Sequence, residues 1–159
     1  MNATERFVMR FYQNIEVHEP FLLCKEMIVD HLGIKLIYWK NTSSIAKYQG
    51  NYYLFLNEML TEQQQWQEFG HEMYHYFYDE TNYGILKETY ATYGESKADY
   101  FAYHFCVPTF MLQELKEVSV YDVMELFNVE FDFALKRLEM YKHRLINRRN
   151  IYGERACEV

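Results

Sequence analysis

Along the first sixty residues, hydrophobic positions pass from helical spacing to short runs typical of β-strands. Residues 20–32 carry apolar side chains at helical spacing, and Gly33 follows where a helix commonly ends. Three short runs rich in β-forming residues come next, at 34–39, 44–48 and 52–56. A glycine-containing turn separates the last two runs, as in a hairpin. The pattern predicts a helix followed by a small antiparallel three-stranded sheet.

From Thr61 onward the spacing is helical. Thr61 and Gln64 match the capping box that opens many helices, and this helix is expected to reach about residue 78. The stretch 79–90 has the composition of a loop, and a second helix then ends before Pro108. Further helices are predicted over 109–117, 119–127 and 131–148. The predicted class is therefore α+β, mainly helical, with a small sheet and a C-terminal helical pair.

Composition narrows the class of protein. A chain of 159 residues with half of them hydrophobic is expected to form one domain with a sizeable core. The formal net charge of −7 disfavours general binding to nucleic acid or anionic membranes. The sequence shows neither a signal-peptide run nor about 18 consecutive apolar residues. Three widely spaced cysteines exclude a disulfide framework, so we expect a soluble cytoplasmic protein.

Within the predicted helix over 61–78 lies an HExxH motif at 71–75. Residues four apart share a helix face, so His71 and His75 can reach one tetrahedral ion, while Glu72 projects sideways towards a water. The apolar stripe of the same helix points about 140–180° away, taking 100° per residue. One face therefore serves the core and the other serves the ligands. The alternative is an ordinary amphipathic helix whose solvent face carries two histidines and a glutamate.

The next predicted helix carries two carboxylates at the same spacing. Glu95 and Asp99 lie on one face with Ala98 and Ala102, whose small side chains allow two helices to approach closely. A catalytic zinc takes three protein ligands, and we expect Glu95 to be the third. Asp99 is then placed to accept the outer N–H of a ligand histidine. Without the HExxH motif, a solvated acidic face would be the simpler interpretation.

These motifs resemble the ImmA/IrrE family of zinc metallopeptidases, which occurs in phages, mobile elements and bacterial stress responses. The matching segments are LFLN at 54–57, FGHEMYH at 69–75, ESKADYFA at 95–102 and CVP at 106–108. Agreement covers about 54–108 and continues more weakly to about 145. Two positions depart from the family pattern: Gly70 replaces the usual alanine, and Tyr74 stands where a small residue usually precedes the second histidine.

The resemblance implies a zincin-like fold and a ligand set for Zn²⁺ made of His71, His75 and Glu95. It implies that Glu72 is the catalytic residue, which takes a proton from the attacking water and delivers it to the leaving amine. The implied activity is zinc-dependent endopeptidase cleavage of a protein. The implied substrate is a helix-turn-helix repressor of a phage or mobile element.

The C-terminal quarter is predicted to be helical and basic. We expect a zincin-like domain over 1–118 and a helical extension over 119–159 packed on it, the two forming one structural domain. The spacing resembles a helix-turn-helix, but the start of its second helix is acidic and apolar, where base contacts need basic or amide groups. Direct nucleic-acid binding is therefore not expected. The basic residues are interpreted as a solvated face: Lys136, Arg137, Lys142, Arg144, Arg148, Arg149 and Arg155.

Two other function classes stay open. One is a non-catalytic zinc-containing antirepressor that sequesters a repressor, although Glu72 argues against it because binding alone needs no proton transfer. The other is a DNA-binding module, which a steep salt dependence of duplex binding would reveal. The sequence indicates no oligomeric state.

Substrate binding and oxyanion stabilisation are predicted only in outline. The strand over 52–56 is expected to offer an edge to which an extended substrate adds as a further strand. The candidate oxyanion donors are the Tyr and His residues of 74–104, which are too numerous to narrow down and include Tyr78, Tyr90, Tyr93 and His104. His104 lies about 180° from Glu95 on its helix, so we expect it in the core or at the surface rather than at the metal.

Overall fold

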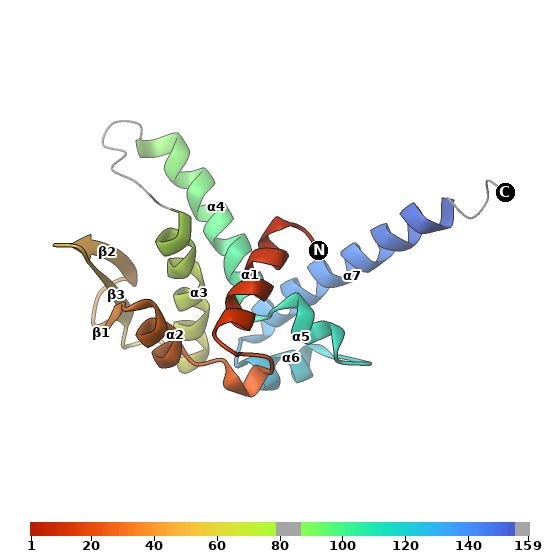
Figure 1. Cartoon of the computed structure of the whole chain (residues 1–159), viewed down its shortest axis with the longest axis horizontal. Coiled ribbons are helices and arrows are strands. Elements are labelled where there is room, and N and C mark those ends of the chain that lie inside the picture. The colour runs from red at the N-terminus through yellow and green to blue at the C-terminus, as the bar shows by residue number, and fades with distance from the viewer. Residues whose placement is uncertain (79–86, 155–159) are drawn as a thin grey trace.

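The computed structural model describes residues 1–78 and 87–154, with side chains described outside 87–93 and 147–154. Its elements are α1 (Ala3–Asn14), η1 (Pro20–Leu22), α2 (Lys25–Leu32), β1 (Lys35–Trp39), β2 (Ser44–Tyr48), β3 (Asn51–Asn57), α3 (Glu62–Tyr78), α4 (Lys87–Cys106), α5 (Thr109–Gln113), α6 (Val120–Phe127) and α7 (Phe131–Glu154). The sheet lies on one side of α3, with α1, α4 and α7 on the other (Figure 1). The predicted α+β class is confirmed.

Local signals in the sequence explain where several elements begin and end. Gly33 ends α2 in the left-handed conformation, at φ 68°. At the start of α3, the backbone N–H of Gln64 donates to Thr61 Oγ1, and the Gln64 side chain accepts from the backbone N–H of Thr61. Ser119 and Asp122 form a second capping box, before α6. These three boundaries are therefore where the sequence predicted them.

Other boundaries differ from the prediction. Helix α1 was not predicted, although Asn2 and Glu5 form a capping box at its start. The helix expected over 20–32 is divided into η1 and α2, and the helix expected over 109–117 ends at Gln113. The loop expected over 79–90 lies partly outside the described residues, and α4 already begins at Lys87.

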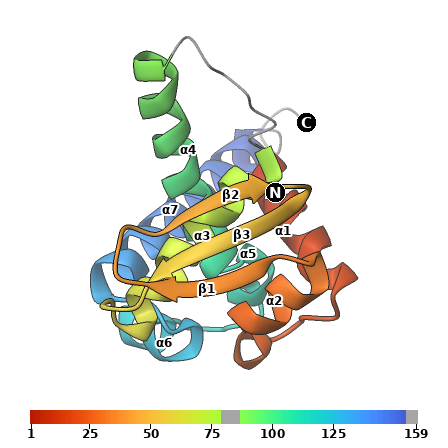
Figure 2. The same cartoon turned by 90° about the vertical axis from the view of Figure 1, so that its left-hand side faces the viewer.

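The sheet is mixed, so the prediction of an antiparallel three-stranded sheet is wrong for one pairing. Its order is β1-β3-β2, with β2 antiparallel and β1 parallel to β3 (Figure 2). The β2–β3 turn matches the prediction, with Gln49 and Gly50 both at positive φ. Strand β3 occupies the centre of the sheet. Its Leu54 and Leu56 are the strand residues that the core buries completely. The chain after β1 therefore passes the end of β3 to reach the far edge.

Helices α3 and α4 pack closely because the residues between them are small. Ala98 and Ala102 of α4 are buried, as the sequence predicted. A Cβ atom added to Gly70 of α3 would lie 2.6 Å from Cys106 Sγ and 3.4 Å from Ala102 Cα. The Cys106 thiol in turn donates to the backbone carbonyl of Trp66. The absence of a side chain at position 70 thus sets how near the two helices lie.

A buried polar network joins α1, α5 and α7. Arg137 is 1% exposed, and it donates to the carbonyl of Val107 and to Thr109 Oγ1. Thr109 and Arg144 both donate to Glu5 Oε1, at 2.9 and 2.8 Å. Arg137 and Arg144 therefore do not belong to a solvated basic face, as the sequence had suggested. Their guanidinium groups instead hydrogen-bond to groups of other elements where α7 packs against the rest of the chain.

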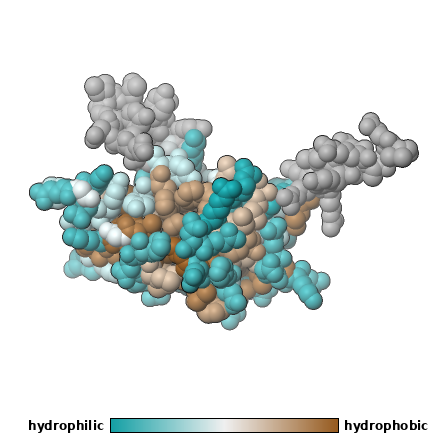
Figure 3. All heavy atoms as spheres, viewed as in Figure 1, coloured by the Kyte–Doolittle hydropathy of each residue, from teal (hydrophilic) through white to brown (hydrophobic). Residues whose placement is uncertain are grey.

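The surface mixes apolar and hydrophilic side chains. Figure 3 shows the two kinds interleaved over the face seen in Figure 1. Within the described part of the chain, no helix has both the length and the apolar character needed to cross a bilayer.

We predict that Gly70→Ala destabilises the protein although alanine favours helix formation by about 1 kcal/mol. Overpacking against Cys106 is expected to cost about 1–3 kcal/mol, measured by urea unfolding. In a Cys106→Ala background the contact is removed, and the same change is expected to be neutral or stabilising. A stabilising effect of Gly70→Ala alone would contradict this account.

We also predict an acid-sensitive contribution from His104, which is 3% exposed. Burial, and then the neighbouring Arg137 charge, lower the pKa of His104 from 6.5 to about 3. Between these values only the unfolded chain binds the proton, so the free energy of unfolding falls by about 1.4 kcal/mol per pH unit as the pH drops below 6.5.

Urea unfolding from pH 7 to about 5, with EDTA throughout, measures this slope against His104→Leu. Glu5 does not interfere, because the pKa of its carboxyl lies below 4.5 in the folded chain. Burial would raise that pKa, but hydrogen bonds from Asn2 and Thr109 outweigh it. Equal slopes in the two proteins would contradict the prediction.

Candidate metal centre

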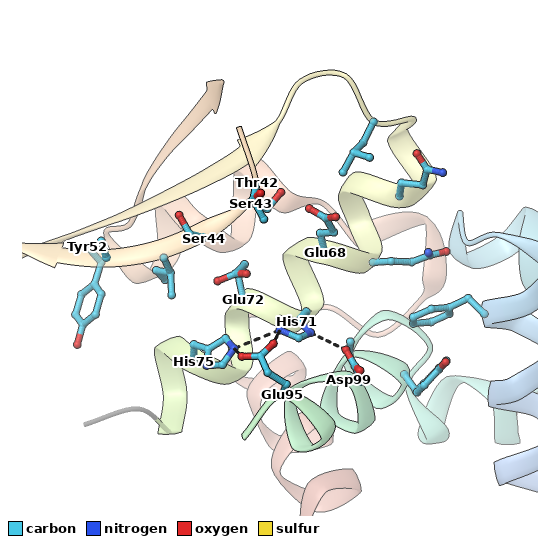
Figure 4. Close-up of a pocket in the computed structure, with 18 of the residues that line it drawn as sticks. Thr42, Ser43, Ser44, Tyr52, Glu68, His71, Glu72, His75, Glu95 and Asp99 are labelled. Carbon is cyan, nitrogen blue, oxygen red and sulfur yellow. Dashed lines mark hydrogen bonds and ion pairs between the residues drawn. The ribbon is translucent and has the colours of Figure 1, made fainter. Parts of the chain in front are cut away.

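Two histidines and a glutamate converge between α3 and α4. His71 Nε2 lies 3.0 Å from Glu95 Oε2 and 3.3 Å from His75 Nε2. His75 Nε2 lies 3.5 Å from Glu95 Oε1. The histidine side chains are 20% and 17% exposed, and that of Glu95 is 58% exposed. The structure therefore brings the three predicted ligand residues together around one point that solvent can reach (Figure 4).

This donor set fits a zinc ion. Zinc in proteins is bound tetrahedrally by imidazole nitrogens and carboxylate oxygens at about 2.0–2.1 Å, which places two donors on the same ion about 3.3 Å apart. The separations of 3.0, 3.3 and 3.5 Å lie around that value. The three donors found among the described residues leave one position of a tetrahedron open, as in catalytic sites.

Asp99 lies where it orients one of these donors. Its Oδ1 is 2.8 Å from His71 Nδ1, the ring nitrogen that does not face the other donors. Accepting a hydrogen bond from this N–H leaves the lone pair on Nε2 and fixes the orientation of the ring. Glu95 and Asp99 are one turn apart on α4, so the same helix supplies a donor and the group that orients another.

Glu72 stands beside the three donors without joining them. In Figure 4 its side chain projects from α3 towards β2. Burial raises the pKa of Glu72 to about 7, with the nearby Glu95 and Glu68 adding to the effect and His75 opposing it. A carboxyl group with a pKa near neutrality exchanges protons readily in both directions. The geometry and the pKa both suit a proton-transfer role.

The site lies in a cleft of about 1480 Å³. One wall is β2 with the residues just before it, and the floor is a stripe of α3 side chains. Parts of α4 and the beginning of α7 close the far side. Within the described parts of the chain, β2 is paired only with β3, and residues of β2 line the cleft, so its other edge faces this space.

The expected substrate edge is therefore on a different strand. The sequence placed it on 52–56, but β3 is paired on both sides and has no free edge. Among the candidate oxyanion donors, His104 is in the core, and Tyr78 packs on Phe7 and is not part of the cleft lining. The side chains of Tyr90 and Tyr93 lie outside the described residues.

Several cleft residues were not found from the sequence. Gln64, Gln67 and Glu68 continue the cleft face of α3 towards its start. The two glutamine amides donate to the carboxylate of Glu130, which precedes α7. The signal was available, since positions 64, 67, 68, 71, 72 and 75 follow helical spacing. The contact of these glutamines with Glu130 could not be predicted, because it joins segments more than 60 residues apart in the sequence.

Known proteins share much of this chain. The family model Peptidase_M78, described as the IrrE N-terminal-like domain, matches residues 29–139. The chain is 32% identical to the uncharacterized protein YqaB of Bacillus subtilis (strain 168), over 89% of this chain and 85% of that protein. It is 30% identical to the phage-like element PBSX protein XkdA of the same organism, over 91% of this chain and 75% of that protein.

A solved structure of a Mycobacterium tuberculosis transcriptional regulator has a similar fold. Its TM-score is 0.65 over 87% of this chain, at 18% sequence identity. The chain spans 47% of that structure. The likeness therefore concerns the fold of this part alone.

We predict that removing the Asp99 carboxylate weakens metal binding. Asp99→Ala is expected to lower zinc affinity about 10–100-fold, because His71 loses the acceptor that orients it. Asp99→Asn keeps a neutral acceptor and is expected to fall between the two. Competition with a chromophoric chelator measures the affinities, and a wild-type affinity in Asp99→Ala would contradict the proposed orientation of His71.

Proposed function

Because the chain belongs to the Peptidase_M78 family of IrrE N-terminal-like domains, we propose that it is a zinc-dependent endopeptidase that cuts a protein substrate. The observation that carries the proposal is the convergence of His71, His75 and Glu95 beside Glu72. All four line a cleft bordered by a free strand edge. A protein that only sequestered a partner would need neither the open metal position nor the adjacent carboxyl group.

The proposed substrate is a helix-turn-helix repressor of a phage or mobile element. The phage-like element context of the relative XkdA supports this choice. Such repressors act in the cytoplasm, which is the compartment that the proposal requires. The charge of the chain, formally −7, agrees with a protein substrate rather than a DNA substrate.

In the proposed reaction, the side chains divide the work. His71, His75 and Glu95 would hold Zn²⁺, which supplies Lewis acidity that polarises the scissile carbonyl and lowers the pKa of a water molecule. A Glu72 carboxylate oxygen takes a proton from the attacking water and then delivers it to the leaving amine nitrogen. Asp99 keeps the His71 ring in the orientation in which Nε2 faces the other donors.

The free edge of β2 is the proposed binding surface for the cleaved segment. On the side away from β3, no other strand among the described residues pairs with Ser44–Tyr48. An extended peptide can add there as a strand, with its scissile bond passing over the HExxH residues. The backbone of Ile45 already hydrogen-bonds to Glu72, which places the strand within reach of the reacting groups.

We predict that two substitutions separate metal binding from chemistry. The wild type is expected to hold about one zinc ion per chain. Glu95→Ala removes a donor, so the zinc content of this variant is expected to fall far below that value. Glu72→Gln keeps all three donors, so it is expected to retain zinc while losing about 10²–10⁴-fold in cleavage rate. Elemental mass spectrometry measures the metal, and mapping of new protein termini in cells expressing each variant measures cleavage.

Glu62→Ala, an exposed change in the first turn of α3, is the matched control and is expected to behave as the wild type. The proposal is overturned if the wild type takes up no zinc after metal-supplemented purification. It is also overturned if new termini arise equally with Glu72→Gln.

A further inference from the structure

The cleft carries a strong excess of negative charge. Among the residues that the structure describes, its lining includes five carboxylates, namely Glu68, Glu72, Glu95, Asp99 and Glu130, and one cation, Lys47. A divalent ion together with Lys47 offsets three of the five formal charges. The partners of Glu130 are neutral amides, from Gln64 and Gln67, so they leave its charge in place. A substrate segment entering this cleft therefore meets a negative potential.

Glu68 is a cleft carboxylate that lacks, within the described part of the chain, a hydrogen-bond donor for one of its two oxygens. Its Oε2 atom is closed to solvent and has no hydrogen-bond partner among the described residues. A shielded carboxylate oxygen without a donor costs free energy that a ligand supplying the donor would recover. Figure 4 shows Glu68 on the same face of α3 as Glu72, projecting towards Thr42 and Ser43, which immediately precede β2. The Glu68 carboxyl group thus lies between α3 and the segment that leads into β2.

The position of Glu68 relates it to a substrate lying along β2. From Glu68 to the middle of the His71–His75 pair is about five residues of helix, which corresponds to about 7.5 Å along the axis. An extended chain covers that distance in about two residues. The strand runs alongside, with Ser43 near Glu68 and the Ile45 backbone at Glu72.

We propose that Glu68 is a specificity-determining residue that binds a lysine or arginine side chain of the substrate, about two positions from the scissile bond. A cationic side chain supplies the N–H donors that Glu68 Oε2 lacks, and charge-assisted hydrogen bonds are stronger than neutral ones. The remaining negative charge of the cleft favours the same side chain and disfavours an acidic one. This inference rests on the proposed endopeptidase function and adds the sequence preference of the cleft.

Peptide hydroxamates test the preference without requiring turnover. The hydroxamate group chelates a metal with an open position, and the attached residues report on the cleft. Two series of four-residue peptides are used, one with the hydroxamate at the N-terminal end and one with it at the C-terminal end. Each peptide carries lysine or its uncharged analogue norleucine at the first, second or third position counted from the hydroxamate. Calorimetry on the zinc-loaded full chain measures Kd for each pair, with acetohydroxamate as the probe of the metal alone.

In one series, lysine at the second position is expected to bind about tenfold more tightly than norleucine. Glu68→Gln is expected to reduce this ratio to less than about twofold, because the amide keeps the volume but removes the charge. Glu62→Gln, exposed and outside the cleft, is expected to keep the full ratio. Unfolding curves of both variants check that the fold is unchanged.

The failures are distinguishable. If neither acetohydroxamate nor any peptide binds, the proposed zinc peptidase function is overturned, and the proposed preference for a cationic side chain is overturned with it. If acetohydroxamate and the peptides bind but lysine and norleucine are equivalent at every position, the function stands and the role of Glu68 is overturned. A lysine preference that survives in Glu68→Gln also overturns it.

Discussion

The close crossing of α3 and α4 is the constraint on which the rest of the structure depends. The HExxH helix carries two of the candidate metal ligands, but the third candidate ligand and the carboxylate that contacts His71 come from the other helix. Their separations of about 3 Å require the two backbones to lie near each other, which only small residues between them allow. Gly70, Ala98 and Ala102 are those residues. The chemistry at the surface is therefore set by packing one layer below it.

How much of the fold could be predicted from the sequence depended on whether the signal was local. Caps and turns such as those at Thr61, Ser119 and Gly50 involve residues a few positions apart, and they lie where they were expected. The parallel pairing of β1 with β3 could not be predicted, because strand order depends on which strand the core buries most deeply. The burial of Arg137 depends on partners in distant segments, so composition suggested a solvated face instead.

The same distinction applies to the site. His71, His75, Glu95 and Asp99 could be grouped as candidate site residues because each pair is spaced four apart on its own helix. The structure brings the two pairs together where two small-residue faces pack closely. The substrate wall was assigned to the wrong strand, since an edge is a property of the whole sheet rather than of one segment. Glu68 was missed for another reason: nothing in a sequence shows that a carboxylate oxygen lacks a donor.

The free edge of β2 has a consequence for any protein that is cut here. A five-residue edge strand pairs only with an extended backbone whose N–H and C=O groups are unpaired. A helix is not extended, and a strand inside a sheet already uses these groups. In the proposed reaction, the substrate must first open locally, so the cleavage rate would scale with the population of the opened segment. Whatever stabilises that segment in the substrate, such as oligomerisation or a bound ligand, would protect it as effectively as a change of its sequence. In the proposed reaction, the local conformational stability of the substrate would then set how long it survives before it is cleaved.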